Sequence, residues 1–242
     1  QFMNVTAGVV EVLKSMLSML ENVNFVEEGM QWLIGHSKTY EGAVEILKCE
    51  MSIALCLDCI DKHRLNINVI FPALKLLNRL ILFNIEEMDY SKRKCHFSHE
   101  GKIRIDTVTH TMNYEGLKLN KVMIATHAHN AEIMKLVCEM LWAFCIGGSE
   151  EESRVARLFV EEGLVSSMKF LLEEQVDFNV LGHVGEILYF VIQYSDRGRR
   201  QLVENGGVDA LRNVMRNVEF MGDGGGGSNL QSSLSKVLML LL

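Results

Sequence analysis

The sequence predicts an all-α protein, an α-solenoid of about four to five helical repeats. Two stretches, 115–146 and 162–193, carry this prediction. Each runs from a Glu-Gly-Leu triplet through a short apolar helix and a polar break into a longer apolar helix. Their glycines, Gly116 and Gly163, lie 47 residues apart, and a period of about 20–50 residues is typical of solenoids. Pro72 is the only proline in 242 residues, which favours long helices with short connections.

The first part of the chain reads as a succession of helices. Gly8 precedes residues 9–20, in which apolar side chains recur every three or four positions, the helical period. A polar break near Asn22 separates this helix from one expected at 25–35. A short helix at 38–48, a helix at 50–63 and a strongly apolar helix at 67–83 follow. Pro72 is expected near the first turn of the last of these, where a missing N–H costs least.

Two segments of the second part depart from the helical pattern. Residues 86–104 are polar and charged without a strong period, so we expect an inserted loop there, followed by a short helix at 105–114. Further helices are expected at 195–205 and 207–220. The glycine-rich run 222–228 has the composition of a flexible linker. It reads as an insertion within the last repeat, because a helical pattern resumes at 230–242; an engineered linker is the alternative.

Aligning the units places their starts near Gly8, Glu50, Gly116, Gly163 and Gly207. The order of short helix, glycine, second helix, polar break and long third helix resembles the armadillo repeat. It is clearest in 129–144 (HNAEIMKLVCEMLWAF), 155–174 (VARLFVEEGLVSSMKFLLEE) and 199–217 (RRQLVENGGVDALRNVMRN). HEAT repeats are the near neighbour, but the glycine and the short first helix favour armadillo. The resemblance implies one right-handed repeat domain over 1–242, with a truncated last repeat.

The resemblance also implies a binding face, because the third helices of armadillo-like solenoids line a concave surface along which extended partners lie. Offsets from the unit starts, together with an aromatic strip, give the expected partner-binding residues: Gln31, Lys75, Arg79, Glu139, Trp142, Ala143, Glu186, Phe190, Tyr194, Lys236 and Leu240. Nuclear-import receptors carry asparagine in one column of that face. The corresponding positions here hold Gly35, Arg79, Ala143, Phe190 and Leu240, which argues against nuclear import. Trp142 and Phe190 can equally be read as core residues.

The expected function is therefore that of a non-catalytic scaffold or adaptor, which binds a partner peptide or helix along the concave face. The alternative is an armadillo-type regulator of a nucleotide-binding enzyme, either an exchange factor or the regulatory arm of a larger kinase or GTPase. Net charge is −7 and there is no long basic run, so a nucleic-acid partner is not expected.

The apolar end of the chain, VLMLLL, is far shorter than the roughly 20 residues of a membrane-spanning helix. We therefore expect no membrane insertion. An exposed, uncapped last helix instead predicts self-association or partner contact through that helix.

The sequence offers little that suggests catalysis or a cofactor. It contains no phosphate-binding loop, nucleophile elbow or zinc-protease motif, and its paired glutamates read as solvated helix ends. Most of the six cysteines lie in apolar helical patterns, so we expect free thiols and a cytoplasmic protein, with the nucleus as the alternative. Cys95, His96 and His99 in the inserted loop are candidate zinc ligands, against the reading of an ordinary polar loop. No cofactor is expected.

Overall fold

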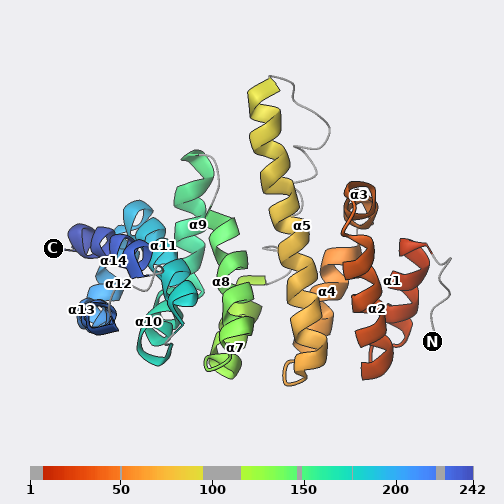
Figure 1. Ribbon diagram of the computed structural model, residues 1–242, viewed down its shortest axis with the longest axis horizontal. Helices are drawn as coiled ribbons and strands as arrows, with labels where there is room; N and C mark the ends of the chain where they lie inside the picture. The colour runs from red at the N-terminus through yellow and green to blue at the C-terminus, as the bar shows by residue number, and fades with distance from the viewer. Residues whose placement is uncertain are drawn as a thin grey trace. The chain divides into compact units, whose positions relative to one another are not determined.

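The computed structural model describes residues 8–49, 51–94, 116–145, 149–175, 177–221 and 227–241. In these ranges the chain forms thirteen α-helices and no strand (Figure 1), which confirms the all-α prediction. The chain packs as two compact units, residues 1–119 (unit 1) and 120–242 (unit 2), each with its own core. The prediction of a single repeat domain stays a prediction.

Unit 1 is organised around one long helix. Its helices are α1 (Val9–Ser18), α2 (Val23–His36), α3 (Tyr40–Lys48), α4 (Met51–Lys62) and α5 (Ile67–Lys94). Helix α5 packs against both α2 and α4, and its far end extends beyond the other helices of the unit (Figure 1). Its apolar residues from Val69 to Ile81 form much of the core of the unit.

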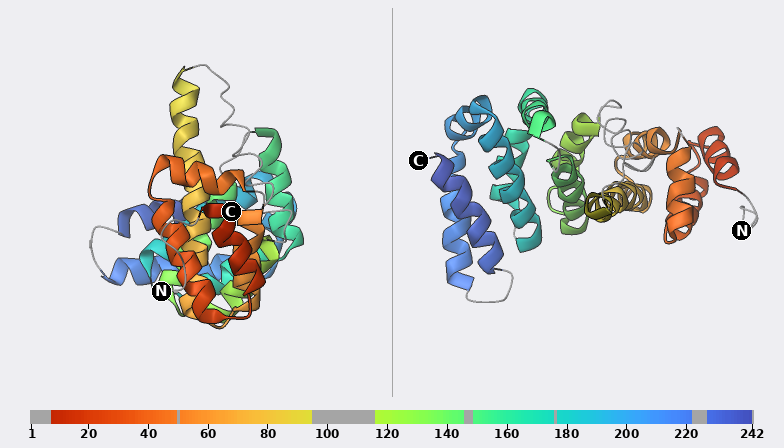
Figure 2. Two further views of the ribbon diagram at one scale, coloured as in Figure 1. Left: turned by 90° about the vertical axis from the view of Figure 1, so that its right-hand side faces the viewer. Right: turned by 90° about the horizontal axis from the view of Figure 1, so that it is seen from above.

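Unit 2 is organised around α11. Helix α7 (Gly116–His127) contains the division between the units, and α8 (Ala131–Cys145), α9 (Ser149–Glu161), α10 (Leu164–Glu174), α11 (Phe178–Tyr194), α12 (Asp196–Glu204), α13 (Gly207–Met221) and α14 (Gly227–Leu241) follow. Helix α11 packs against α8 on one side and α14 on the other (Figure 2). Gly185 permits the close approach of α14, because a Cβ atom there would lie 3.1 Å from Leu234.

Three of the polar breaks between helices contain the N-cap residue of the helix that follows. The side chains of Asn22, Asn130 and Asp177 accept hydrogen bonds from the first backbone N–H groups of α2, α8 and α11, with donor–acceptor distances of 2.9–3.2 Å. Such a cap satisfies a donor that the helix itself leaves unpaired. The break that a hydropathy pattern detects is therefore the start signal of each longer helix.

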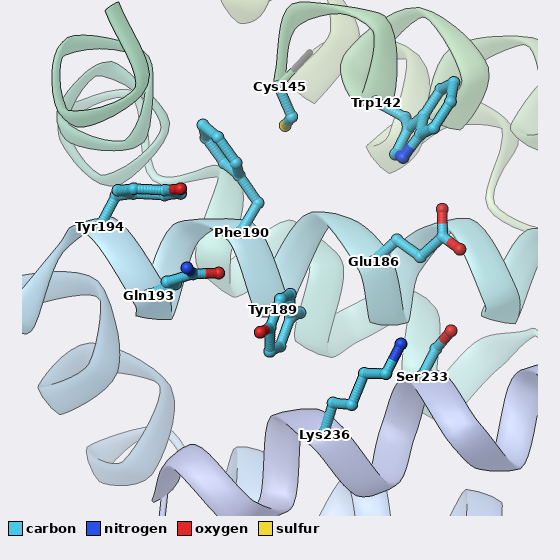
Figure 3. Close-up of a pocket in the computed structure, with 9 residues that line it drawn as sticks. All are labelled: Trp142, Cys145, Glu186, Tyr189, Phe190, Gln193, Tyr194, Ser233 and Lys236. Carbon is cyan, nitrogen blue, oxygen red and sulfur yellow. The ribbon is translucent and has the colours of Figure 1, made fainter. Parts of the chain in front are cut away.

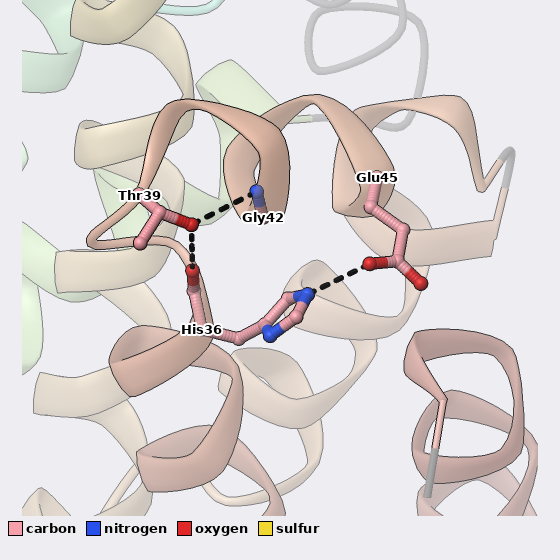
Figure 4. Close-up of polar contacts among 4 residues, drawn as sticks. All are labelled: His36, Thr39, Gly42 and Glu45. Carbon is pink, nitrogen blue, oxygen red and sulfur yellow. Dashed lines mark hydrogen bonds and ion pairs between the residues drawn. The ribbon is translucent and has the colours of Figure 1, made fainter.

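The short helices α3 and α12 begin with the same local structure. Thr39 and Ser195 are their N-caps, and each hydroxyl accepts a hydrogen bond at 3.1 Å from the N–H of a glycine three residues later, Gly42 or Gly198. In unit 1 the junction is reinforced by His36, whose Nε2 lies 2.8 Å from Oε2 of Glu45 (Figure 4). The His36 ring also stacks on Trp32, with ring centroids 4.9 Å apart.

In both units a side chain that follows one helix contacts the carbonyl oxygen of a residue that follows the helix three places earlier. In unit 1 a ring nitrogen of His63, after α4, lies 2.7 Å from the carbonyl oxygen of Leu20, after α1. In unit 2 the amide of Gln175, after α10, donates to the carbonyl oxygen of Ala128, after α7. Gln175 and Ala128 are 47 residues apart, the same spacing that separates Gly163 from Gly116.

Two glycines between helices of unit 2 have a left-handed backbone conformation. Gly163 and Gly206 have φ values of 75° and 79°, a backbone conformation that favours glycine because it has no Cβ. They follow α9 and α12, respectively, so Gly206 is the structural counterpart of Gly163. The sequence alignment had placed this unit start one residue later, at Gly207.

Helix α5 differs from the sequence-based expectation in its length and in the position of its proline. Residues 86–94, expected in a loop, instead continue α5, because glutamate, methionine, lysine and arginine are good helix formers even without an apolar face. Pro72 lies in the second turn of α5 rather than the first. The remainder of the expected loop, 95–104, and residues 222–226 of the glycine-rich run lie outside the described residues.

Within the described ranges, no helix combines the length and apolar character needed to cross a bilayer.

Candidate functional site

Unit 2 contains a cavity of about 370 Å³ between the surfaces of α8, α11 and α14. We call it the aromatic pocket (Figure 3). Its lining residues are Trp142 and Cys145 from α8; Glu186, Tyr189, Phe190, Gln193 and Tyr194 from α11; and Ser233 and Lys236 from α14.

Helical periodicity explains how one helix supplies most of the wall. Glu186, Tyr189, Phe190, Gln193 and Tyr194 follow one another at spacings that keep them on one face of α11. The opposite face of α11 is buried through residues such as Val184, Ile187, Leu188 and Val191. The core therefore fixes the orientation of α11, and that orientation aims the polar and aromatic face at the pocket.

The aromatic side chains are only partly covered. Trp142, Tyr189 and Tyr194 are half-buried, whereas Phe190 is 8% exposed and forms the floor with Cys145. The rings of Phe190 and Tyr194 pack in a tilted arrangement with centroids 5.1 Å apart. The Trp142 ring lies 6.3 Å from that of His183, which supports the indole from outside the pocket.

Opposite charges lie on neighbouring walls of the pocket. Glu186 on α11 and Lys236 on α14 are both exposed, and neither forms an ion pair within the described ranges. Figure 3 shows the Glu186 carboxylate beside Trp142, and the Lys236 ammonium directed toward Glu186 and Ser233. One turn before Trp142, Oε1 of Glu139 lies 3.9 Å from Nζ of Lys135. The pocket therefore combines ring faces, one accessible carboxylate and one accessible ammonium.

The structure brings together five of the eleven expected partner-binding residues: Trp142, Glu186, Phe190, Tyr194 and Lys236. Of the other expected residues of unit 2, Ala143 is 2% exposed, so its methyl group belongs to the core. Glu139 and Leu240 lie on α8 and α14, respectively, but do not line the pocket.

Four pocket residues were not expected from the sequence: Cys145, Tyr189, Gln193 and Ser233. The two columns expected from the sequence are spaced by four residues, about one helical turn. Each missed residue lies three residues from an expected one, which is also a same-face spacing on a helix. Applying both spacings to α8, α11 and α14 would have found them.

The remaining expected residues, Gln31, Lys75 and Arg79, belong to unit 1. They lie on α2 and α5, which pack side by side. Gln31 and Lys75 are exposed and Arg79 is half-buried. The Lys75 ammonium lies 5.8 Å from the centroid of the Phe71 ring on its own helix, so this aromatic face is covered by a cation.

All of the described cysteines except the half-buried Cys49 are buried like apolar side chains. Five are free thiols: Cys49, Cys56, Cys59, Cys138 and Cys145. Burial, and then the nearby Asp58 carboxylate, raises the pKa of Cys59 to about 12. Burial also raises the pKa of Cys145 in the pocket floor. These thiols are poor nucleophiles, because the thiolate is the reactive form.

No cluster of three or more potential metal-ligating side chains occurs among the residues that the structure describes. The candidate ligands Cys95, His96 and His99 lie outside those residues.

No protein-family model matches the chain, and no curated protein matches it in sequence. In structure the chain is similar to a crystal structure of an engineered protein, with a TM-score of 0.56 and 14% sequence identity. That likeness covers 99% of this chain and 97% of the engineered one. It concerns the fold alone, and the resemblance to armadillo repeats stays a prediction.

Proposed function

We propose that the chain is a non-catalytic interaction scaffold with an armadillo-like solenoid fold, and that it binds a partner peptide or helix in the aromatic pocket. The observation that carries this proposal is the meeting of Trp142, Tyr189, Phe190 and Tyr194 at one cavity on a third-helix surface. The order of helices in unit 2 supports the solenoid, because two successive sets of three, α9–α11 and α12–α14, follow the expected repeat.

Partly exposed aromatic residues are suited to binding because they bury a large area with little loss of side-chain freedom. Tryptophan and tyrosine are enriched among the residues that contribute most to protein–protein affinity. Trp142, Tyr189 and Tyr194 retain exposed surface that a partner could cover, while their rings are positioned by the core beneath them. A preorganised surface of this kind lowers the entropic cost of association.

Polar groups around the rings would orient the partner. Gln193 is exposed and offers an amide with both donors and an acceptor, a suitable group for pairing with peptide backbone. The opposite charges of Glu186 and Lys236 would favour one orientation of a partner over the reverse, since electrostatic complementarity contributes more to specificity than to affinity.

The test is comparative affinity capture with the full chain. Wild type, a Trp142→Ala variant and a Phe170→Ala variant are immobilised, and captured proteins are quantified by mass spectrometry. Phe170 is a matched control, because it is aromatic, 38% exposed and located on α10 outside the pocket. Proteins that bind through the pocket should be lost with Trp142→Ala and retained with Phe170→Ala.

Purified partner then gives the quantitative result. Loss of a central tryptophan should weaken binding about 30-fold or more, the effect of an interface hot spot. Melting temperatures of both variants check that the fold is intact. Equal capture of every protein by wild type and Trp142→Ala would exclude the pocket as the binding site.

A further inference from the structure

We infer that the aromatic pocket accepts the side chain of an arginine, presented singly by the partner rather than within a basic run. This inference rests on the proposed function and specifies the partner's chemistry. It follows from which groups surround the cavity, what charge they carry and how they are arranged.

The aromatic rings that line the pocket are suited to bind a cation. Four of the nine lining residues are aromatic, and three of these keep part of their surface accessible. Aromatic faces carry negative electrostatic potential and attract cations, most strongly at tryptophan. An apolar side chain could also cover these rings, but it would leave the carboxylate of Glu186 partly desolvated without a partner, which is costly.

The carboxylate of Glu186 is available to pair with the same cation. Glu186 is exposed, lies beside the indole of Trp142 in Figure 3, and forms no ion pair within the described ranges. A cation stacked on Trp142 can therefore also donate a charge-assisted hydrogen bond to the neighbouring Glu186 carboxylate. Such bonds are about twice as strong as those between neutral groups.

The geometry favours a guanidinium over an ammonium group. Guanidinium is planar, stacks on a ring and can bind a carboxylate through two parallel hydrogen bonds at its edge. A fully enclosed aromatic cage would instead suit a quaternary ammonium group. Figure 3 shows Trp142 and Phe190 separated by Cys145, so the rings do not enclose a cage.

Lys236 restricts the site to one cation. Its ammonium lies on the α14 wall, exposed and directed toward Glu186. A single guanidinium can pair with Glu186 while remaining next to the ring face. A second cation would meet Lys236 at close range without a carboxylate to compensate, so a run of basic residues should bind less well per charge.

The experiment is an NMR titration of the ¹⁵N-labelled full chain with short capped peptides. The probes are acetyl-Leu-Arg-Leu-amide and two analogues in which citrulline or lysine replaces arginine. Citrulline preserves the shape of arginine and removes its charge. The protein has two tryptophans, so the Trp142 indole resonance reports on the pocket and the Trp32 indole in unit 1 is an internal reference.

The arginine peptide should shift the Trp142 resonance and leave that of Trp32 unchanged. It should bind about tenfold more tightly than the citrulline peptide, because the neutral citrulline lacks the cation–π attraction and the charge assistance of the hydrogen bond to Glu186, and more tightly than the lysine peptide. Glu186→Gln should reduce the arginine–citrulline ratio to within about twofold. Lys236→Met, which retains the aliphatic stem, should tighten arginine binding by about twofold or more.

Glu204→Gln is the matched control, since Glu204 is an exposed carboxylate on α12 outside the pocket; it should leave all affinities unchanged. Equal binding of arginine and citrulline peptides, an unchanged ratio in Glu186→Gln, or no shift of Trp142 with any peptide would overturn the arginine assignment. A captured protein that requires Trp142 but tolerates Glu186→Gln would also overturn it, while leaving the scaffold function intact.

Discussion

In unit 1 a ring nitrogen of His63 reaches the carbonyl oxygen of Leu20, and in unit 2 the amide of Gln175 reaches that of Ala128. Each contact joins the end of one helix to the end of the helix three places earlier, although a histidine makes one and a glutamine the other. Both side chains can donate one hydrogen bond to a carbonyl oxygen. The requirement at this position is therefore a donor of suitable length, and different residues satisfy it.

The surface formed by α8, α11 and α14 in unit 2 differs in its exposed side chains from the surface formed by α2 and α5 in unit 1. In unit 2 the rings of Trp142, Tyr189 and Tyr194 remain accessible around a cavity. In unit 1 Lys75 lies over Phe71, on a surface that also carries Gln31 and Arg79. Internal contacts repeat from unit to unit, whereas the surface chemistry does not. Similar contacts between helix ends therefore recur in both units, whereas the aromatic pocket lies in unit 2.

The largest contrast is expected in thiol reactivity. Cys49 in unit 1 is half-buried, whereas Cys138 and Cys145 in unit 2 are buried. A buried thiol reacts only when the structure opens, so native-state alkylation should label Cys49 on the order of a hundredfold faster. Burial, and then the Glu45 charge, raises the pKa of Cys49. Its labelling rate should thus keep rising with pH beyond the range of an ordinary thiol.

Peptide mass spectrometry over a time course checks this ordering. Rapid labelling of Cys138 under native conditions would show that the core of unit 2 opens readily, and would contradict the packing described for α8.

The next contrast concerns the glycines that begin the short helices. A methyl group at Gly42 would overlap the backbone carbonyl oxygen of His36, which cannot move without shifting α2. At Gly198 the closest atom would be a side-chain methyl of Val191, at 2.8 Å, so a smaller displacement relieves the overlap than at Gly42. Gly42→Ala should therefore cost about 3 kcal/mol in unfolding free energy and Gly198→Ala about 1 kcal/mol.

Urea denaturation of both variants measures these costs. Gly35→Ala is the control in unit 1, because its methyl group would meet no atom within 4 Å. It should be neutral or stabilise by up to about 1 kcal/mol through helix propensity. Equal losses for Gly42→Ala and Gly198→Ala would mean that the two junctions are not built differently.

A smaller contrast in unfolding free energy is expected between substitutions at Gln175 and at His63, the two side chains that contact a carbonyl oxygen after an earlier helix. Gln175 is 8% exposed, so Gln175→Ala leaves the Ala128 carbonyl oxygen without its donor in a buried setting. That should cost about 2 kcal/mol. The His63 contact is only part-buried, and water can replace the lost donor, so His63→Ala should cost about 1 kcal/mol. Denaturation midpoints with unchanged m-values would establish the comparison; a larger loss at His63 would reverse it.

The smallest effect is expected from the surface pair between Lys62 and Glu21 in unit 1. Their side chains are 40% and 81% exposed, and ion pairs at such exposure contribute little because water and salt screen them. Lys62→Ala should change the unfolding free energy by less than about 0.5 kcal/mol. A loss above 1 kcal/mol would show that this pair is an essential part of the contact between α4 and the turn that follows α1.

The sequence predicted the helices well, because their boundaries have local causes. Asn22 and Asp177 are caps with short polar side chains, and Gly163 has the positive φ that glycine favours. These signals act within one turn of the chain and can be read without a structure. The end of α5 was missed because residues 86–94 have helical propensity but no apolar periodicity, and periodicity was the signal used.

The candidate site was only partly predictable. The resemblance to armadillo repeats led us to expect Trp142, Glu186 and Phe190 on one surface, because it implies that the third helices share a face. It did not show that Phe190 would be almost covered or that Ala143 would be in the core. Those outcomes depend on how closely α8, α11 and α14 approach, which is set by contacts such as Gly185 against Leu234.

The measurement that tests the central claim most directly is the affinity of one purified, pocket-dependent partner for two variants of the full chain. Arg79→Glu reverses a charge on the third-helix surface of unit 1, and Glu186→Arg reverses one in the aromatic pocket of unit 2. Isothermal titration calorimetry should show affinity within about twofold of wild type for Arg79→Glu, and a loss of about 30-fold or more for Glu186→Arg. A comparable loss for both variants, or a loss for Arg79→Glu alone, would contradict the assignment of the binding site to unit 2.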